Sequence, residues 1–146
     1  MIGRLIGIDH GLARIGIAVS DASGIVAREL TIITRASKAE DFAQIKQIAA
    51  DENAVAFVVG IPSSLDAAEG TFTQADKVRN WIGYFSETTD LPIVEWDEQL
   101  SSDDAREIAR IQKRPYDAHI DDLAARVILQ SYLNALNDGL AAPPIR

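Results

Sequence analysis

Three acidic side chains stand at positions where the local pattern predicts an inward orientation: Asp9, Glu98 and Asp121. Carboxylates that converge on one point repel one another unless a cation joins them. Metal-assisted phosphodiester hydrolysis uses such a cluster, because two divalent ions about 3.5–4 Å apart activate a water molecule and stabilise the leaving oxygen. This chemistry requires neither histidine nor cysteine. The acids therefore indicate a metal-dependent hydrolase.

Asp9 follows the apolar run Leu5-Ile6-Gly7-Ile8 and precedes Gly11 by two residues. The run predicts a strand, and open α/β sheets place ligands at the carboxyl ends of their strands. Gly11 allows a tight turn or the close approach of a ligand. The alternative interpretation is that Asp9 only begins a hairpin turn, as aspartate often does.

Glu98 follows an apolar segment that predicts a further strand. Because side chains alternate between the two faces of a strand, Glu98 shares a face with Val94 and Trp96, and Asp97 shares the other face with Glu95. Glu98 is thus the predicted inward acid if the strand continues that far. Asp97 is then a helix cap or a solvent-facing residue, and the alternation holds only without a bulge.

Asp121 begins the last helical pattern of the chain. It heads a row of apolar side chains that must face the core, namely Ala125, Ile128, Leu129, Tyr132 and Leu136. Asp122 instead begins a polar stripe with Arg126, Gln130 and Asn134, and its i,i+4 pairing with Arg126 predicts a surface position. An inward acid needs a partner, because an unpaired buried carboxylate is costly. The alternative role for Asp121 is a helix N-cap.

The elements that must position these acids change in type along the chain. The first third has the pattern of strands joined by tight turns, and the remainder alternates between helical and strand patterns. The predicted strands are residues 4–10, 14–20, 25–34, 54–59 and 91–96, and the predicted helices are residues 38–51, 72–84, 101–114 and 121–137. This order predicts an α/β fold with a mixed five-stranded sheet, in which three antiparallel strands are followed by parallel strands, covered by helices.

The composition limits the kinds of site that the protein can hold. The chain has 146 residues, no cysteine and two histidines, which excludes disulfides, thiolate zinc sites and histidine-rich metal sites. Carboxylate ligands suit magnesium, manganese or calcium. The formal net charge of −8 opposes nucleic-acid binding, although bound divalent ions would reverse the sign locally.

The length predicts one domain over residues 1–138, followed by a flexible tail over residues 139–146 that contains Gly139, Pro143 and Pro144. No stretch approaches about 20 continuous apolar residues, and the N-terminus has the pattern of a strand and not of a signal peptide. We therefore expect a cytoplasmic protein that does not enter membranes.

Four segments of the chain stand in an order and spacing that identify a family. They lie within about residues 4–133 and are Asp9-His10-Gly11-Leu12-Ala13-Arg14-Ile15-Gly16-Ile17-Ala18, Val58-Val59-Gly60-Ile61-Pro62 with Gly70, Asp97-Glu98-Gln99-Leu100-Ser101-Ser102, and Ile120-Asp121-Asp122-Leu123-Ala124-Ala125 with Ile128-Leu129-Gln130-Ser131-Tyr132-Leu133. Together they resemble the YqgF (RuvX) family, Holliday-junction-resolvase-like proteins named for pre-16S ribosomal RNA nuclease activity. The resemblance implies an RNase H-like fold and an acidic site of Asp9, Glu98 and Asp121 with Mg²⁺ or Mn²⁺. This agrees with the predicted orientations.

The chain departs from the pattern of that family in two places. Gln99 stands where the family usually has an arginine, which removes a cation that could contact phosphate. The loop before the third acid is less basic than usual, with Pro115-Tyr116-Asp117 after Arg114. Both changes leave the metal site intact and affect substrate affinity or choice.

The remaining cations are candidates for substrate binding. Four of them lie at helical spacing and can form one basic stripe, namely Arg106, Arg110, Lys113 and Arg114. The alternative is a solvated face paired with Asp103 and Glu107. Arg14 is a fifth candidate for binding substrate phosphate, with a structural salt bridge at the strand edge as its alternative.

These inferences predict an endonuclease that uses Mg²⁺ or Mn²⁺ to hydrolyse phosphodiester bonds of structured nucleic acid. The expected substrate is the precursor of 16S ribosomal RNA, with branched DNA as the alternative. Asp9, Glu98 and Asp121 are the predicted catalytic and metal-binding residues. The alternatives are a noncatalytic RNA- or ribosome-associated protein that keeps the fold, and a nucleotide-binding module with Asp9 and Gly11 before a hairpin. We expect a monomer or a weak homodimer, since cutting opposite strands of a junction requires two sites.

Overall fold

The computed structural model describes residues 2–63, 70–98 and 101–145. The strands are β1 (Arg4–His10), β2 (Arg14–Ser20), β3 (Ala27–Thr34), β4 (Ala54–Ile61) and β5 (Ile93–Asp97), and the helices are α1 (Lys38–Asp51), α2 (Gln74–Ser86), α3 (Ser101–Ile111) and α4 (Asp121–Asn137). None of the helices within these ranges is both long enough and apolar enough to cross a membrane.

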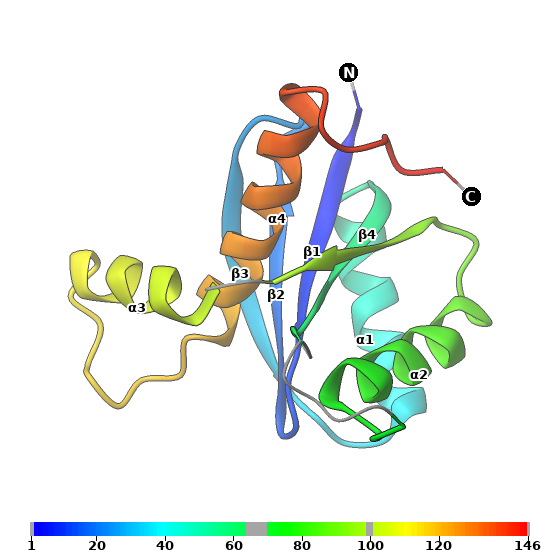
Figure 1. Ribbon diagram of the computed structural model, residues 1–146, viewed down its shortest axis with the longest axis horizontal. Helices are drawn as coiled ribbons and strands as arrows, with labels where there is room; N and C mark the ends of the chain where they lie inside the picture. The colour runs from blue at the N-terminus through cyan, green and yellow to red at the C-terminus, as the bar shows by residue number, and fades with distance from the viewer. Residues whose placement is uncertain (1, 64–69, 99–100, 146) are drawn as a thin grey trace.

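The five strands form one sheet in the order β3-β2-β1-β4-β5 (Figure 1). β2 pairs antiparallel with both β1 and β3, whereas β4 pairs parallel with both β1 and β5. Short connections allow the antiparallel meander, and α1 and α2 provide the crossovers that parallel pairing requires. The predicted mixed sheet, antiparallel in its first three strands and then parallel, is confirmed.

Alternating side chains give the sheet a core on each face. On β1, Ile6 and Ile8 pack with α1 and α2, whereas Leu5 packs with α4. Figure 1 shows α4 on one side of the sheet and α1 with α2 on the other. Because successive side chains of a strand point to opposite faces, Asp9 belongs to the same face as Leu5. That face is the one covered by α4.

Glycines on the sheet allow α4 to approach it closely. A Cβ atom added at Gly60 of β4 would lie 2.5 Å from Cδ1 of Ile128. A Cβ atom added at Gly16 of β2 would lie 1.8 Å from the carbonyl oxygen of Asp121. At Gly16 the obstacle is backbone, which cannot turn aside, so this position determines how near the start of α4 comes to β2.

Gly83 is the opposite case, because it lies within α2 and a Cβ atom added there would meet nothing within 4 Å. Glycine in a helix interior destabilises relative to alanine, since it loses more backbone freedom on folding. We expect Gly83→Ala to raise the free energy of unfolding by roughly 0.5–1 kcal/mol, measured by urea denaturation. A loss of stability would show that α2 needs this glycine for a reason other than space.

The segment after α4 is bonded back to the helix. The hydroxyl of Tyr132 donates a hydrogen bond to the carbonyl oxygen of Ala142 (2.6 Å), and Ala141 packs against the core beneath α4. These contacts hold part of the segment that the sequence predicts to be a flexible tail. The predicted domain boundary at residue 138 stays a prediction.

Candidate active site

Asp9 lies near the carboxyl end of β1, the central strand, and is paired in register with Gly16 of β2. The hairpin that follows is closed by a hydrogen bond from the backbone N–H of Gly11 to the carbonyl oxygen of Arg14 (2.9 Å). Asp9 therefore stands before the turn and is not one of its residues. Its carboxylate belongs to the α4 face of the sheet.

Glu98 directly follows β5, and its backbone N–H donates to the carbonyl oxygen of Ile61 at the end of β4 (3.1 Å). A Cβ atom added at Gly60 would lie 2.8 Å from Oε2 of Glu98. The missing side chain of Gly60 thus leaves the space that the carboxylate occupies, on the face that strand alternation predicts. Burial, and then the charge of Asp97, raise the pKa of Glu98. Gln99 lies outside the described residues.

Asp121 is the first residue of α4, and the predicted alternative of an N-cap is wrong. The N-cap is Ile120, which makes no capping hydrogen bond through its side chain. The carboxylate of Asp121 instead accepts a hydrogen bond from Nε of Arg14 on β2 (2.9 Å). Because the backbone of Asp121 touches Gly16, the register partner of Asp9, this end of α4 lies beside Asp9.

The three carboxylates are close enough for Asp9 to respond to the other two. The pKa of Asp9 is raised from 3.8 to about 7, first by burial, then by the negative charge of Glu98 and then by that of Asp121. The structure thus brings the three predicted acids together from β1, the end of β5 and the start of α4. Like charges held near one another in a partly dry site favour the protonated form of one of them.

The donors of this acidic cluster suit a hard divalent cation, although they do not surround one point. All are carboxylate oxygens, which magnesium and manganese prefer, and the repulsion at Asp9 is what a cation would relieve. Within residues 2–63, 70–98 and 101–145, no three His, Cys, Asp or Glu side chains form a group that could hold a metal ion. Asp121 is engaged elsewhere, because its carboxylate is bonded to Arg14. A cation bound by all three acids would therefore share Asp121 with Arg14 or compete with it for Oδ2.

Asp122 is buried, so the surface position predicted for it is wrong. Its carboxylate accepts two hydrogen bonds from the guanidinium of Arg114 (3.0 and 3.1 Å). Arg126, the expected i,i+4 partner of Asp122, binds Glu29 of β3 instead (3.1 Å). The stripe that begins at Asp122 therefore faces β3, where its charged side chains are paired.

The basic stripe predicted from residues 106 to 114 does not form one helix face. α3 ends at Ile111, and Lys113 has a left-handed φ of 58°. The backbone N–H of Lys113 donates to the carbonyl of Arg110, and that of Arg114 donates to the carbonyl of Ala109. These are the two hydrogen bonds of a Schellman motif, which turns the chain away from the helix axis. Lys113 and Arg114 thus leave the α3 face.

The candidate cations also differ in their freedom to bind a substrate. Arg110 pairs with Glu107, as the solvated-face alternative predicts, and Arg114 is held by Asp122 and by Glu29. Among the described residues, the exposed side chains of Arg106 and Lys113 form no ion pair. They are the two members of the predicted set that a phosphate could reach without breaking a salt bridge.

His10 is a half-buried residue with both ring nitrogens buried, and it is not among the predicted site residues although it continues the alternation of Ile6 and Ile8. It lies on the face opposite Asp9, and its ring packs against Trp81 of α2 with ring centroids 4.8 Å apart. Neither ring nitrogen has a hydrogen-bond partner among the described residues. Burial, and then the charge of Arg35, lower the pKa of His10 to about 4.

The buried imidazole of His10 makes the fold sensitive to acid. The pKa is about 4 in the folded chain against a usual 6.5, so the unfolded chain takes up the proton first and the contribution of His10 to stability is lost as the pH falls from 6.5 towards 4. Because solvent screens part of this charge, we expect a loss of roughly 1–2 kcal/mol. The His10→Phe variant should show a smaller loss in urea denaturation over this range. Equal acid losses in both proteins would contradict the assignment.

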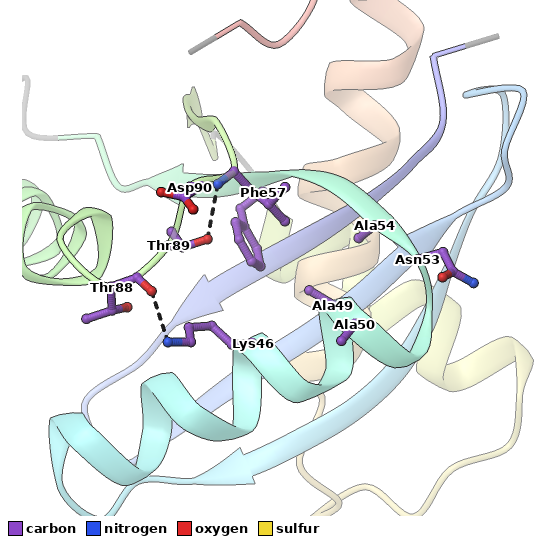
Figure 2. A pocket seen from close by; sticks show the side chains of 10 residues that line it. Lys46, Ala49, Ala50, Asn53, Ala54, Phe57, Thr88, Thr89 and Asp90 are labelled. Carbon is purple, nitrogen blue, oxygen red and sulfur yellow. Dashed lines mark hydrogen bonds between the residues drawn. The ribbon is translucent and has the colours of Figure 1, made fainter.

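A separate pocket of about 560 Å³ lies where β4 begins (Figure 2). It is formed by the end of α1, the start of β4 and the segment before β5, and Figure 2 shows Lys46 reaching towards Thr88. The ammonium group of Lys46 donates to the carbonyl oxygen of Thr88 (2.9 Å). Because Glu98 lies at the other end of β4, the pocket is distinct from the acidic cluster.

Comparison of sequences relates the chain to a group of nucleases. The sequence profile of the RuvX family, described as Holliday junction resolvase, matches residues 3–135. A protein of Thermoanaerobacter pseudethanolicus, provisionally named a pre-16S rRNA nuclease, is 37% identical over 136 residues, which cover 90% of this chain and 96% of the relative. A protein of Rhodopseudomonas palustris with the same provisional name is 39% identical over 148 residues, which cover 97% of this chain and 87% of the relative.

Comparison of structures leads to resolvases at much lower identity. The RuvC protein of T. thermophilus, solved in complex with a Holliday junction substrate, gives a TM-score of 0.66 at 12% identity and covers 98% of this chain and 99% of its own. The fowlpox virus resolvase, solved with Holliday junction DNA, gives 0.56 at 12% identity, covering 91% of this chain and 98% of its own. At such identity the likeness concerns the fold alone. The expected RNase H-like fold is confirmed.

Proposed function

The chain belongs to the RuvX family, and from this premise we propose that it is a divalent-metal-dependent endonuclease that hydrolyses phosphodiester bonds in structured nucleic acid. The observation that carries the proposal is the placement of the three acids on the α4 face, with Asp9 near the end of β1, Glu98 against Gly60 and Asp121 against Gly16. In support, the charges of Glu98 and Asp121 add to burial in raising the pKa of Asp9. Carboxylates gathered in this way serve phosphodiester hydrolysis when divalent ions join them. The proposed ions are Mg²⁺ or Mn²⁺.

In the proposed mechanism the side chains of the cluster have different roles. Asp9 lies on the central strand and would hold the ions from the middle, while Glu98 and Asp121 would hold them from either side. Bound divalent ions supply an activated water and stabilise the leaving oxygen. The burial of Asp9 strengthens every electrostatic interaction at this point, because less water screens the charges.

The proposed path of the substrate runs from the acids towards α3. A pocket of about 460 Å³ is lined by Arg106, Tyr116 and Ile120, among other residues. Ile120, one of the lining residues, immediately precedes Asp121, so the wall of the pocket includes the residue before α4. Arg106 offers a charge for phosphate, and Tyr116, 97% exposed, offers an aromatic ring on which an unpaired base can stack.

For the substrate we propose the precursor of 16S ribosomal RNA, in line with the names of the sequence relatives. With this substrate we also propose a cytoplasmic location for the protein. A monomer or a weak homodimer is sufficient for cutting one strand of RNA, whereas cutting a DNA junction requires two sites related by symmetry.

The decisive experiment compares cleavage of labelled ribosomal RNA precursor and of a four-way DNA junction in the presence of Mn²⁺. Wild type is expected to cut the RNA, and Glu98→Gln is expected to be inactive. Glu95→Gln is the matched control, because Glu95 lies on β5 but is exposed and pairs with Arg79. Wild type that binds the RNA equally in chelator and in Mn²⁺ without cutting it would favour the noncatalytic alternative. Stabilisation by ATP in place of Mn²⁺ would favour a nucleotide-binding module.

A further inference from the structure

Arg14 and Asp121 form an ion pair within the acidic cluster. Nε of Arg14 lies 2.9 Å from Oδ2 of Asp121, and the two side chains are 35% and 20% exposed. Arg14 opens β2 and Asp121 opens α4, so the pair joins two elements that are 107 residues apart in the chain. An ion pair at this depth is partly shielded from solvent, and its attraction is less screened than that of a surface pair.

The backbone of Asp121 has little freedom to move towards the other acids. Its carbonyl oxygen lies where a Cβ atom of Gly16 would be, so the start of α4 already rests on β2. A change of partner for Asp121 must therefore come from rotation of its short side chain. In the orientation that the structure shows, Asp121 is bonded to Arg14, and the described residues contain no three-acid metal group.

We propose that Arg14 and a divalent cation compete for the carboxylate of Asp121, so that Arg14 is the internal counter-ion of the third acid until metal binds. This inference rests on the proposed metal-dependent function. A doubly charged ion held by the carboxylates of Asp9 and Glu98 would attract the Asp121 carboxylate more strongly than the single charge of Arg14 does. Metal binding then rotates Asp121 into the site and releases the guanidinium.

The released guanidinium remains near the cleavage point, because Arg14 lies across the hairpin from Gly11, two residues after Asp9, and on the same strand as Gly16, the register partner of Asp9. A guanidinium offers a planar fork of donors that suits two oxygens of one phosphate. Arg14 thus changes partner from the carboxylate of Asp121 to the substrate. It acts on the metal as a positioning residue, through Asp121, and on the substrate directly.

The test measures Mn²⁺ binding by isothermal titration calorimetry, with Mn²⁺ alone as the probe. Removing the competing cation in Arg14→Gln should lower the Kd for Mn²⁺ by roughly 3- to 10-fold. The same variant should raise the KM for the RNA substrate, because a phosphate contact is lost. A residue with only a structural role would weaken metal binding when replaced, so the direction of the change in Kd distinguishes the two roles.

Two controls separate competition for Asp121 from a general effect of charge. In an Asp121→Asn background, Arg14→Gln should leave the Kd unchanged, because the effect passes through that carboxylate. Arg35→Gln removes another cation near the hairpin, one that bonds Gly11 and faces Asp41, and it should change the Kd much less. Circular dichroism checks that each variant is folded.

The measured Kd values for Mn²⁺ test the competition for Asp121 separately from the proposed metal-dependent function. If wild type binds Mn²⁺ but Arg14→Gln binds it equally or more weakly, the competition is wrong and the proposed function stands. If Arg35→Gln or the Asp121→Asn background gives the same gain, the effect is general electrostatics and the exchange is wrong. If wild type binds no Mn²⁺, both proposals are overturned.

Discussion

Replacing Asp9 with asparagine is expected to reduce the rate of RNA cleavage by more than about 100-fold. Asparagine keeps the shape of the side chain and removes the negative charge that would hold the ions. Loss of a group that merely supports a metal ligand costs about 10–100-fold in activity or affinity, so loss of a central ligand should exceed that range. Single-turnover cleavage of labelled RNA with saturating Mn²⁺ measures the change.

The same variant is expected to be more stable than wild type in chelator. The pKa of Asp9 is about 7 in the folded chain against 3.8, so the folded chain holds a proton that the unfolded chain has already lost. The contribution of Asp9 to the stability of wild type therefore falls as the pH rises from about 4 to about 7. Each pKa unit corresponds to about 1.4 kcal/mol, so Asp9→Asn should gain up to about 4 kcal/mol above pH 7 and little below pH 4.

The comparison between the two proteins isolates Asp9, because His10 titrates in both. Urea denaturation at several pH values in chelator gives the difference in the free energy of unfolding. A difference that stays constant with pH would show that Asp9 is ionised normally and does not face the other acids. Retained cleavage by a folded Asp9→Asn protein would remove the basis of the nuclease mechanism.

Gly16→Ala is expected to cause the largest loss of stability of any single methyl group added to the chain's described glycines. The new Cβ atom would lie 1.8 Å from the carbonyl oxygen of Asp121 and 2.2 Å from its carbonyl carbon, and backbone atoms cannot turn aside as a flexible side chain can. Overpacking a core costs typically 1–3 kcal/mol, and we expect about 3 kcal/mol or more here. Thermal unfolding should show a fall in Tm of roughly 10 °C.

Gly83→Ala is the matched control for this effect, because a Cβ atom there meets nothing within 4 Å and the variant should be stabilised. Gly16 has no positive φ, so its loss of stability comes from space and not from backbone conformation. Displacement of α4 also moves Asp121 away from Asp9, so cleavage should fall in any Gly16→Ala protein that still folds. Wild-type stability in Gly16→Ala would mean that α4 does not rest on β2.

The sequence alone predicted the faces of Asp9 and Glu98, because strand alternation is short-range, whereas helical periodicity wrongly placed Asp122 at the surface. The positions of Ile6 and Ile8 on one face and Leu5 on the other already assign Asp9 to a face of β1, and the pattern before Glu98 does the same for β5. The five-stranded sheet followed from the order of the elements and the shortness of the first connections.

Partners across long sequence distances were decided only by the tertiary structure. Local pattern separated Asp121 from Asp122 by their helical rows, yet both carboxylates are paired, one with Arg14 and the other with Arg114. Those pairs depend on how deeply α4 docks and on where the chain leaves α3, and neither quantity is contained in a periodicity. The depth is determined by Gly16, whose role is visible only once α4 lies against it, because steric exclusion acts between segments that the fold brings together.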